Sequence, residues 1–234
     1  MASIGIGIIS FAHGHGGVYL NRMKGFDDVR LVAAWDDNEQ RGRSAAEQYG
    51  MTYTPHLEDL LGDRSIDAVI ITCETNRHAD MVEAAARAGK AVLLQKPMAT
   101  TLEDCDRIIR VVDETGIYFQ MAFQMRFDPL NLKMKELIDS GTLGKVGLIR
   151  RRHCINFLFN PDLPKSLSAW HIDPVANVGM FFDDAVHAAD LLYWLLGKPT
   201  TVTAEIDNIL TNIAPDDTGV AIYRFPEGAM GVLV

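Results

Sequence analysis

The sequence predicts an α/β fold: a doubly wound parallel sheet in the N-terminal half, followed by an α+β domain with a mostly antiparallel open sheet. Two observations predict this class. Short β-rich runs alternate with longer helical patterns over the first half of the chain, and most of these runs are continuously apolar, as parallel strands buried on both faces require. The pattern changes after residue 123. We therefore expect two domains, 1–123 and 124–234, in a chain of 234 residues.

The first domain contains six candidate strands, which are short and rich in β-branched residues. Their ranges are 4–10, 29–35, 51–54, 66–72, 91–94 and 117–122. The segments between them show helical patterns with recognisable ends. We expect helices over 38–49, 76–88 and 101–113, with Asn38, Asn76 and Thr101 as their N-terminal caps.

The second domain combines two apolar helical patterns with four candidate strands. The helices are expected at 128–140 and 182–196, the strands at 145–155, 202–209, 220–225 and 230–234, and a loop rich in proline and asparagine at 156–177. The last expected strand has no polar tail after it. We therefore expect a shortened chain, and a homo-oligomer in which the second-domain sheet pairs with a partner.

Charge and cysteine usage narrow the function class. The formal net charge of −9 disfavours binding to nucleic acid or to acidic membranes, so a small molecule is the expected partner. The apolar run at 4–12 is too short to span a membrane. Because Cys73, Cys105 and Cys154 form no CxxC pair, we expect a reduced, cytoplasmic protein.

The turn after the first strand occupies the place where a dinucleotide-binding fold carries its glycine-rich loop. Ser10, Ala12 and His15 stand at the three glycine positions, with Phe11 and His13 between them. Serine and alanine are small enough to let backbone N–H groups approach a pyrophosphate. A solvated turn is the alternative. A metal site is not expected, because the two histidine side chains should diverge in an extended turn and no third ligand is near.

Asp36 follows the second strand, where a carboxylate can accept both hydroxyls of the adenosine ribose. A carboxylate there disfavours the 2′-phosphate of NADP. We therefore expect NAD rather than NADP, although Arg41 or Arg43 could attract such a phosphate. The alternative is that Asp36 or Asp37 caps the following helix.

Polar residues also follow the fourth and fifth candidate strands. Thr72, Asn76 and His78 follow the fourth strand, and Gln95-Lys96-Pro97 follows the fifth. At the end of a buried strand the Lys96 ammonium is partly desolvated, and Pro97 restricts its backbone, so the side chain can be aimed at a ligand. A solvated strand end is the alternative.

The order of these motifs resembles the glucose-fructose oxidoreductase, inositol dehydrogenase and rhizopine-catabolism (Gfo/Idh/MocA) family. The resemblance rests on the segments 72–78, 88–90, 95–97, 124–129, 143–146 and 183–190. It implies an N-terminal Rossmann domain and a dehydrogenase that oxidises a secondary hydroxyl of a sugar or cyclic polyol with NAD(P). The sequence departs from the family pattern in four respects. Gln95 stands where the family has a glutamate, Ala185 stands where it has a glycine, the glycine-rich turn is altered, and the chain is shorter.

The family carries an aspartate and, four residues later, a histidine, and Asp183 and His187 match these positions. The resemblance implies that His187 removes the hydroxyl proton, that Lys96 stabilises the alkoxide and relays the proton, and that Asp183 orients the substrate. Further substrate contacts are expected from Arg126, Trp170 and His171. The alternatives are a non-catalytic dinucleotide-binding regulator or scaffold, and an enzyme that uses NAD transiently to cleave a glycosidic bond.

Overall fold

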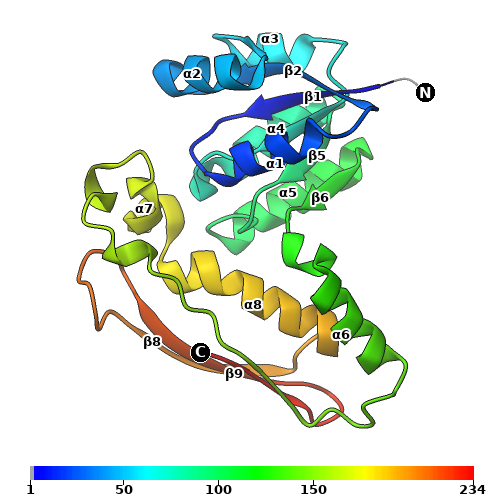
Figure 1. Cartoon of the computed structure of the whole chain (residues 1–234), viewed down its shortest axis with the longest axis vertical. Helices are drawn as coiled ribbons and strands as arrows, with labels where there is room; N and C mark the ends of the chain where they lie inside the picture. The colour runs from blue at the N-terminus through cyan, green and yellow to red at the C-terminus, as the bar shows by residue number, and fades with distance from the viewer. Residues whose placement is uncertain (1–2) are drawn as a thin grey trace. The chain divides into compact units, whose positions relative to one another are not determined.

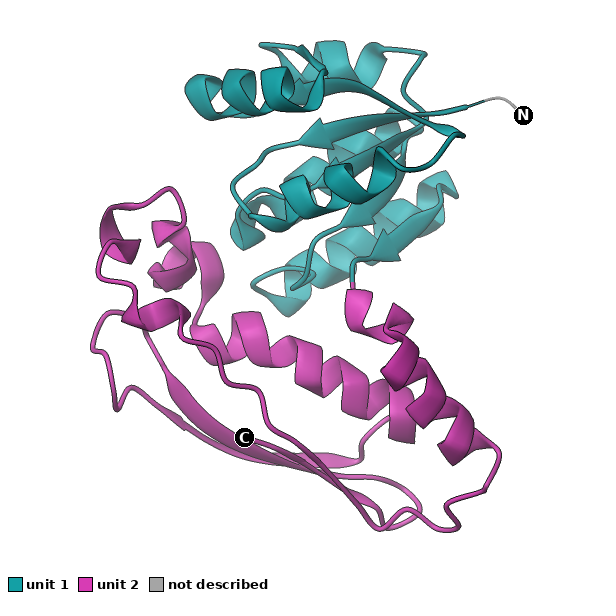
Figure 2. Ribbon diagram, in the orientation of Figure 1, with its two compact units in different colours: residues 1–122 teal, residues 123–234 magenta. Residues whose placement is uncertain are grey.

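The computed structural model describes residues 3–234. The chain divides into two compact units, residues 1–122 and residues 123–234 (Figures 1 and 2). Each unit has its own sheet and its own apolar core.

Unit 1 is built on a six-stranded parallel sheet. Its strands are β1 (Ile4–Ile9), β2 (Val29–Trp35), β3 (Thr52–Tyr53), β4 (Ala68–Ile71), β5 (Ala91–Leu94) and β6 (Phe119–Met121). They lie in the order β3-β2-β1-β4-β5-β6, and all neighbours pair in parallel. The order reverses direction between β1 and β4, which makes the sheet doubly wound. The predicted fold class is confirmed in this unit.

Helices cover both faces of this sheet. They are α1 (His15–Met23), α2 (Glu39–Tyr49), α3 (Leu57–Gly62), α4 (His78–Arg87) and α5 (Leu102–Thr115). One face packs against α1 and α2 through Ile8, Leu20 and Ala46, and the other packs against α3, α4 and α5 in a second cluster that includes Ile9 and Val82. Consecutive residues of β1 thus reach opposite cores, which explains why its sequence is apolar throughout.

Two of the three predicted helix caps are correct. The Asn38 side chain accepts a hydrogen bond from the Arg41 N–H, and the Thr101 hydroxyl accepts one from the Asp104 N–H. The prediction of Asn76 as a cap is wrong. Asn76 lies inside a 3-10 turn, Thr75–Arg77, so its backbone is already helical before α4 begins. An N-cap side chain needs an extended backbone ahead of the first turn.

Unit 2 places helices beside a four-stranded sheet. Its elements are α6 (Pro129–Asp139), β7 (Leu148–Arg151), α7 (Pro174–Asn177), α8 (Met180–Leu196), β8 (Thr201–Asp207), β9 (Thr218–Arg224) and β10 (Met230–Leu233). The strand order is β7-β10-β9-β8, with β8, β9 and β10 antiparallel and β7 parallel to β10. The mostly antiparallel sheet predicted for the second domain is confirmed.

The segment 156–177, predicted as a loop, contains short helices. Three 3-10 helices, Phe157–Phe159, Leu163–Lys165 and Ala169–Ile172, precede α7. Proline lies in the first turn both at Leu163–Lys165 and in α7. Its fixed φ suits the start of a helix, so the proline content that indicated a loop also allows these turns.

The long helix α8 packs across one face of the unit 2 sheet (Figure 1). Ala185, Ala188 and Leu192 on α8 share an apolar cluster with Ala221 on β9 and Leu233 on β10. This packing fixes the rotation of α8 and therefore the direction of its polar residues. Among the helices of residues 3–234, none combines the length and apolar character that a membrane crossing needs.

Candidate functional site

The predicted cofactor residues of unit 1 follow the carboxyl ends of four adjacent strands. Ser10 follows β1, Asp36 follows β2, Thr72 follows β4 and Gln95 follows β5. Because all strands are parallel, these ends lie along one edge of the sheet, where doubly wound folds bind ligands. All four residues are buried.

The turn after β1 adopts a backbone conformation that usually needs glycine. Ser10 has φ +70°, in the left-handed region. Its carbonyl accepts a 2.6 Å hydrogen bond from the Thr72 hydroxyl, and its own hydroxyl accepts one of 3.2 Å from the Ala12 N–H. In the fingerprint, the first glycine adopts this left-handed conformation without strain. In this chain Ser10 adopts it, and the two hydrogen bonds stabilise the turn.

Gly16 takes the packing role of the third fingerprint glycine, which sequence register had assigned to His15. A Cβ atom at Gly16 would lie 2.8 Å from the Thr72 Oγ1 and 3.2 Å from the Ile8 Cδ1. The helix α1 therefore approaches the sheet as closely as the fingerprint requires. The fingerprint spacing does not predict this residue, because Gly16 lies one position later than the third glycine of the fingerprint.

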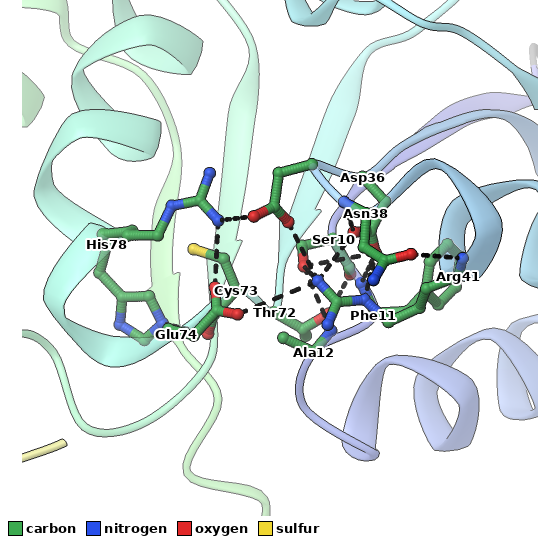
Figure 3. A network of polar contacts seen from close by, with 12 residues as sticks. Ser10, Phe11, Ala12, Asp36, Asn38, Arg41, Thr72, Cys73, Glu74 and His78 are labelled. Atoms are coloured by element: carbon green, nitrogen blue, oxygen red, sulfur yellow. Dashed lines mark hydrogen bonds and ion pairs between the residues drawn. The ribbon is translucent and has the colours of Figure 1, made fainter. Parts of the chain in front are cut away.

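Asp36 is nearly completely buried, and both its carboxylate oxygens are hydrogen-bonded (Figure 3). The backbone N–H groups of Phe11 and Asn38 donate at 2.7 and 2.8 Å, and the Arg41 guanidinium donates through Nε at 2.9 Å and through Nη2 at 2.8 Å. The alternative that Asp36 or Asp37 caps α2 is wrong, because Asn38 provides the cap.

Arg41 and Asp37 belong to a wider charged network with Glu74 and Arg77 (Figure 3). Asp37 pairs with Arg41 at 3.0 Å and with Arg77 at 2.7 Å. Burial by itself would raise the pKa of Asp37, but the charge of Arg77 and further hydrogen bonds outweigh it and hold that pKa below its usual value. The Asp37 carboxylate therefore remains ionised at neutral pH.

Gln95 connects a cluster of polar side chains after β1. Its amide Oε1 accepts a 2.6 Å hydrogen bond from the Tyr19 hydroxyl, and its Nε2 lies 3.1 Å from His13 Nε2 and 2.9 Å from His15 Nδ1. Burial raises the pKa of Tyr19 to about 12, so its hydroxyl remains a donor. The predicted divergence of the two histidines is wrong. Their ring centroids are 4.6 Å apart, because the chain turns into a helix at Gly14 instead of staying extended.

Lys96 is 3% exposed and lies two residues after β5. The peptide bond between Lys96 and Pro97 is cis. His78, predicted to contact the cofactor, has its Nδ1 2.9 Å from the Pro97 carbonyl oxygen and its Nε2 3.2 Å from the Cys73 carbonyl oxygen. His78 therefore joins the end of β4 to the Lys96-Pro97 segment. Asn76 lies exposed in the turn before α4.

Cys73 is completely buried beside these residues, and burial raises the pKa of its thiol far above the usual value. Among residues 3–234, no group of three or more histidine, cysteine, aspartate or glutamate side chains could hold a metal ion.

In unit 2, Asp183 and His187 lie one turn apart on α8, and both are buried. His171 Nδ1 lies 2.7 Å from Asp183 Oδ2, a pairing that the sequence analysis did not predict. The Trp170 ring stacks on His171 with centroids 3.7 Å apart. Two of the expected substrate contacts thus lie in the segment before α7: His171 contacts Asp183 directly, and Trp170 stacks on His171.

Arg126 forms a two-point ion pair with Asp190 on α8. Its Nε and Nη2 donate to the two carboxylate oxygens at 2.9 and 2.6 Å. These hydrogen bonds raise the pKa of Arg126 above its usual value. The ion pair joins the 3-10 helix Gln124–Phe127 to α8.

The residues of unit 1 fit a nicotinamide dinucleotide. A left-handed turn at Ser10, the small residue Ala12 and the close approach at Gly16 reproduce the three steric conditions of the glycine fingerprint. The first turn of α1 contains no acidic residue, so no side-chain carboxylate opposes a phosphate at that helix end. Asp36 stands at the end of β2, where a dinucleotide-binding fold of this type places the acceptor for the ribose.

Two family models together match most of the chain. The model described as an oxidoreductase family with an NAD-binding Rossmann fold matches residues 1–123, and the model of the GFO/IDH/MocA C-terminal domain matches residues 131–234.

Curated relatives and solved structures match nearly the whole chain. The myo-inositol 2-dehydrogenase of Thermotoga maritima is 30% identical over 97% of this chain and 67% of its own length. The scyllo-inositol 2-dehydrogenase (NAD(+)) of Bacillus subtilis is 28% identical, with coverages of 98% and 65%. The WlbA dehydrogenase of Bordetella pertussis, solved with NADH and UDP-GlcNAcA, superposes with a TM-score of 0.88 at 26% identity, with coverages of 99% and 66%. The chain thus spans about two thirds of the length of these relatives.

Proposed function

Because the chain belongs to the Gfo/Idh/MocA oxidoreductase family, whose N-terminal domain has an NAD-binding Rossmann fold, we propose that it transfers a hydride between NAD and a secondary hydroxyl of a sugar or cyclic polyol. The resemblance found in the sequence is thereby confirmed. The observation that carries the proposal is the buried ammonium of Lys96, which follows β5 on the sheet edge that also holds Ser10 and Asp36. The two inositol dehydrogenases among the relatives support the substrate class.

In this proposal unit 1 binds NAD and unit 2 binds the substrate. The turn Ser10–His13 and the start of α1 would lie against the pyrophosphate, and Asp36 would hold the adenosine ribose. The nicotinamide end would lie near Lys96, against the residues that follow β4 and β5. Those residues are Thr72, Asn76, His78, Gln95 and Pro97.

NAD supplies the hydride acceptor, and the protein supplies the proton transfer. His187 would take the proton from the substrate hydroxyl, because an imidazole is basic enough to do so near neutral pH. Lys96 would stabilise the negative charge on the substrate oxygen. Asp183, held by His171 at 2.7 Å, would accept a hydrogen bond from a neighbouring hydroxyl.

Two of the predicted substrate contacts have partners that position them. Trp170, whose ring is held by stacking on His171, would contact a sugar ring. Arg126 would act through Asp190, which it binds at two points, by keeping the start of unit 2 attached to α8.

The proposal is tested by mixing the full-length protein with NAD and a panel of inositols and sugars, and following the absorbance of NADH. We expect turnover with at least one cyclic polyol or sugar. Fluorescence titration with NADH serves as the parallel measurement. Binding of NADH without turnover on any member of the panel would instead support a dinucleotide-binding regulator.

We also propose that the protein forms a homo-oligomer through the unit 2 sheet and works in the cytoplasm. Residues of β8 are exposed along the whole strand, and Ile222 of β9 is 43% exposed although it lies in the middle of its strand. All three cysteines are free thiols, as expected in a reducing compartment. Light scattering on the full-length protein is expected to give more than the mass of one chain, and a monomer would contradict the oligomer.

A further inference from the structure

We infer that Arg41 sets the cofactor selectivity of this chain by competing with the adenosine ribose for the Asp36 carboxylate. The inference deepens the proposed function, on which it rests, because it concerns how the same site distinguishes NAD from NADP. It goes beyond the presence of Asp36, which by itself indicates only a preference for NAD.

The Asp36 carboxylate has its hydrogen-bonding capacity filled by the protein. A carboxylate offers about four lone-pair positions. Asp36 receives hydrogen bonds from two backbone N–H groups and from two atoms of the Arg41 guanidinium, and a long one of 3.5 Å from the Ser10 hydroxyl. The backbone donors, Phe11 and Asn38, are fixed by the turn after β1 and by the start of α2. A ribose that binds Asp36 through two hydroxyls must therefore replace the hydrogen bonds of Arg41.

Arg41 has other carboxylates within reach when it leaves Asp36. Its Nη2 lies 3.0 Å from Asp37 and 3.9 Å from Glu74, so the guanidinium can keep an ion pair while it gives up Asp36. The exchange still has a cost, because Arg41 is 11% exposed and its bonds to Asp36 are short and charge-assisted. Arg41 thus weakens NAD binding without preventing it.

The same guanidinium favours the 2′-phosphate of NADP. Arginine binds phosphate at two points, and a second cation, Arg77, pairs with the same two carboxylates, Asp37 and Glu74. Asp36 alone would repel the phosphate, but Arg41 neutralises that charge. Arg41 therefore shifts both affinities toward NADP, and the Asp36–Arg41 pair makes the chain less selective for NAD than Asp36 alone would.

Arg43 provides a matched control on the same helix. Its Nε pairs with Glu39 at 2.7 Å, its guanidinium lies 4.7 Å from the centre of the Tyr53 ring, and its side chain is 59% exposed. Because Arg43 pairs with Glu39 and not with Asp36, its charge acts on Asp36 only at a distance, where salt screens it. Of the two arginines that the sequence offered for a phosphate, the geometry therefore selects Arg41.

The test is a fluorescence titration of the full chain with NADH and with NADPH, in the absence of any substrate. In Arg41→Ala we expect the Kd for NADH to fall and the Kd for NADPH to rise, each about tenfold, as for the loss of one or two charge-assisted hydrogen bonds. In Arg43→Ala both constants should stay within about twofold of the parent. Arg41→Met keeps the aliphatic stem, and it carries the test if Arg41→Ala unfolds.

Three results would overturn the inference. Arg41 is not a competitor if both constants rise together in Arg41→Ala and Arg41→Met, because the side chain would then support both nucleotides. The inference also fails if neither constant changes. The titration measures binding and not turnover, so it is independent of the proposed reaction. A protein that binds both nucleotides but oxidises no polyol would contradict the proposed function, and the inference about Arg41 would still hold. A parent chain that binds neither nucleotide would overturn both.

Discussion

Replacement of Lys96 by methionine should remove most turnover while NADH still binds. Methionine keeps an unbranched apolar stem in the buried position after β5, and it lacks the ammonium that would stabilise the substrate oxygen. The loss of one group that stabilises a developing negative charge lowers the rate by about 10²–10³-fold, so kcat should fall by about 10³-fold. The Kd for NADH should change by less than about tenfold, since one contact among many is lost. Steady-state kinetics and fluorescence titration measure the two effects.

Lys90 is the matched control, because it is a second buried lysine at the other end of β5. Its ammonium donates to the carbonyl oxygens of Asp63 and Ile66 at 2.7 and 2.8 Å, so its role is structural. Lys90→Met should lower the free energy of unfolding by about 1–3 kcal/mol and leave kcat per folded molecule unchanged. If both variants lost turnover equally, the effect would be one of folding, and Lys96 would lose its assigned role.

The substitution Gly5→Ala should destabilise unit 1 severely. A Cβ atom at Gly5 would overlap the backbone carbonyl oxygen of Ser65, so β1 or the chain before β4 would have to move. The Gly5 N–H also donates to the Asp67 carboxylate at 2.7 Å, and this bond resists such a movement. We expect a loss of about 3 kcal/mol or more in the free energy of unfolding, at the upper end for overpacking. Urea unfolding followed by circular dichroism measures it.

Gly14→Ala is the comparison for this substitution. A Cβ atom at Gly14 would meet no other atom within 4 Å, and its φ of −58° suits any residue. Its free energy of unfolding should stay within about 1 kcal/mol of the parent. A Gly5→Ala chain as stable as Gly14→Ala would show that β1 and the segment before β4 can separate at little cost.

The regular part of unit 1 could be predicted from sequence because its signals are local. Continuous apolar runs mark β1, residues 31–35 of β2, β4 and β5. Asn38 and Thr101 cap their helices by accepting hydrogen bonds from the backbone N–H groups three residues later. Asn76 carries the same local signal and fails. The chain leaving β4 makes a 3-10 turn there, which depends on the path to α4 and not on the residue itself.

The site could be predicted only as far as its residues are fixed by their place after a strand. The places of Ser10, Asp36, Thr72 and Lys96 after their strands were predicted in this way, and the structure has them there. The contacts of Gly16 with Thr72, of Gln95 with Tyr19, and of His171 with Asp183 join residues that are distant in sequence or related by an unusual spacing. No local pattern encodes such contacts, and they decide how each side chain is held.

The burial of Cys73 has a practical consequence for chemical labelling. A thiol must ionise to react with an alkylating reagent, and burial opposes ionisation of Cys73, so the reagent should spare the thiol beside the nucleotide site. Cys154, in contrast, is exposed and belongs to unit 2. A fluorophore attached at neutral pH would therefore mark unit 2 at Cys154, and it would leave the Rossmann unit chemically untouched at Cys73.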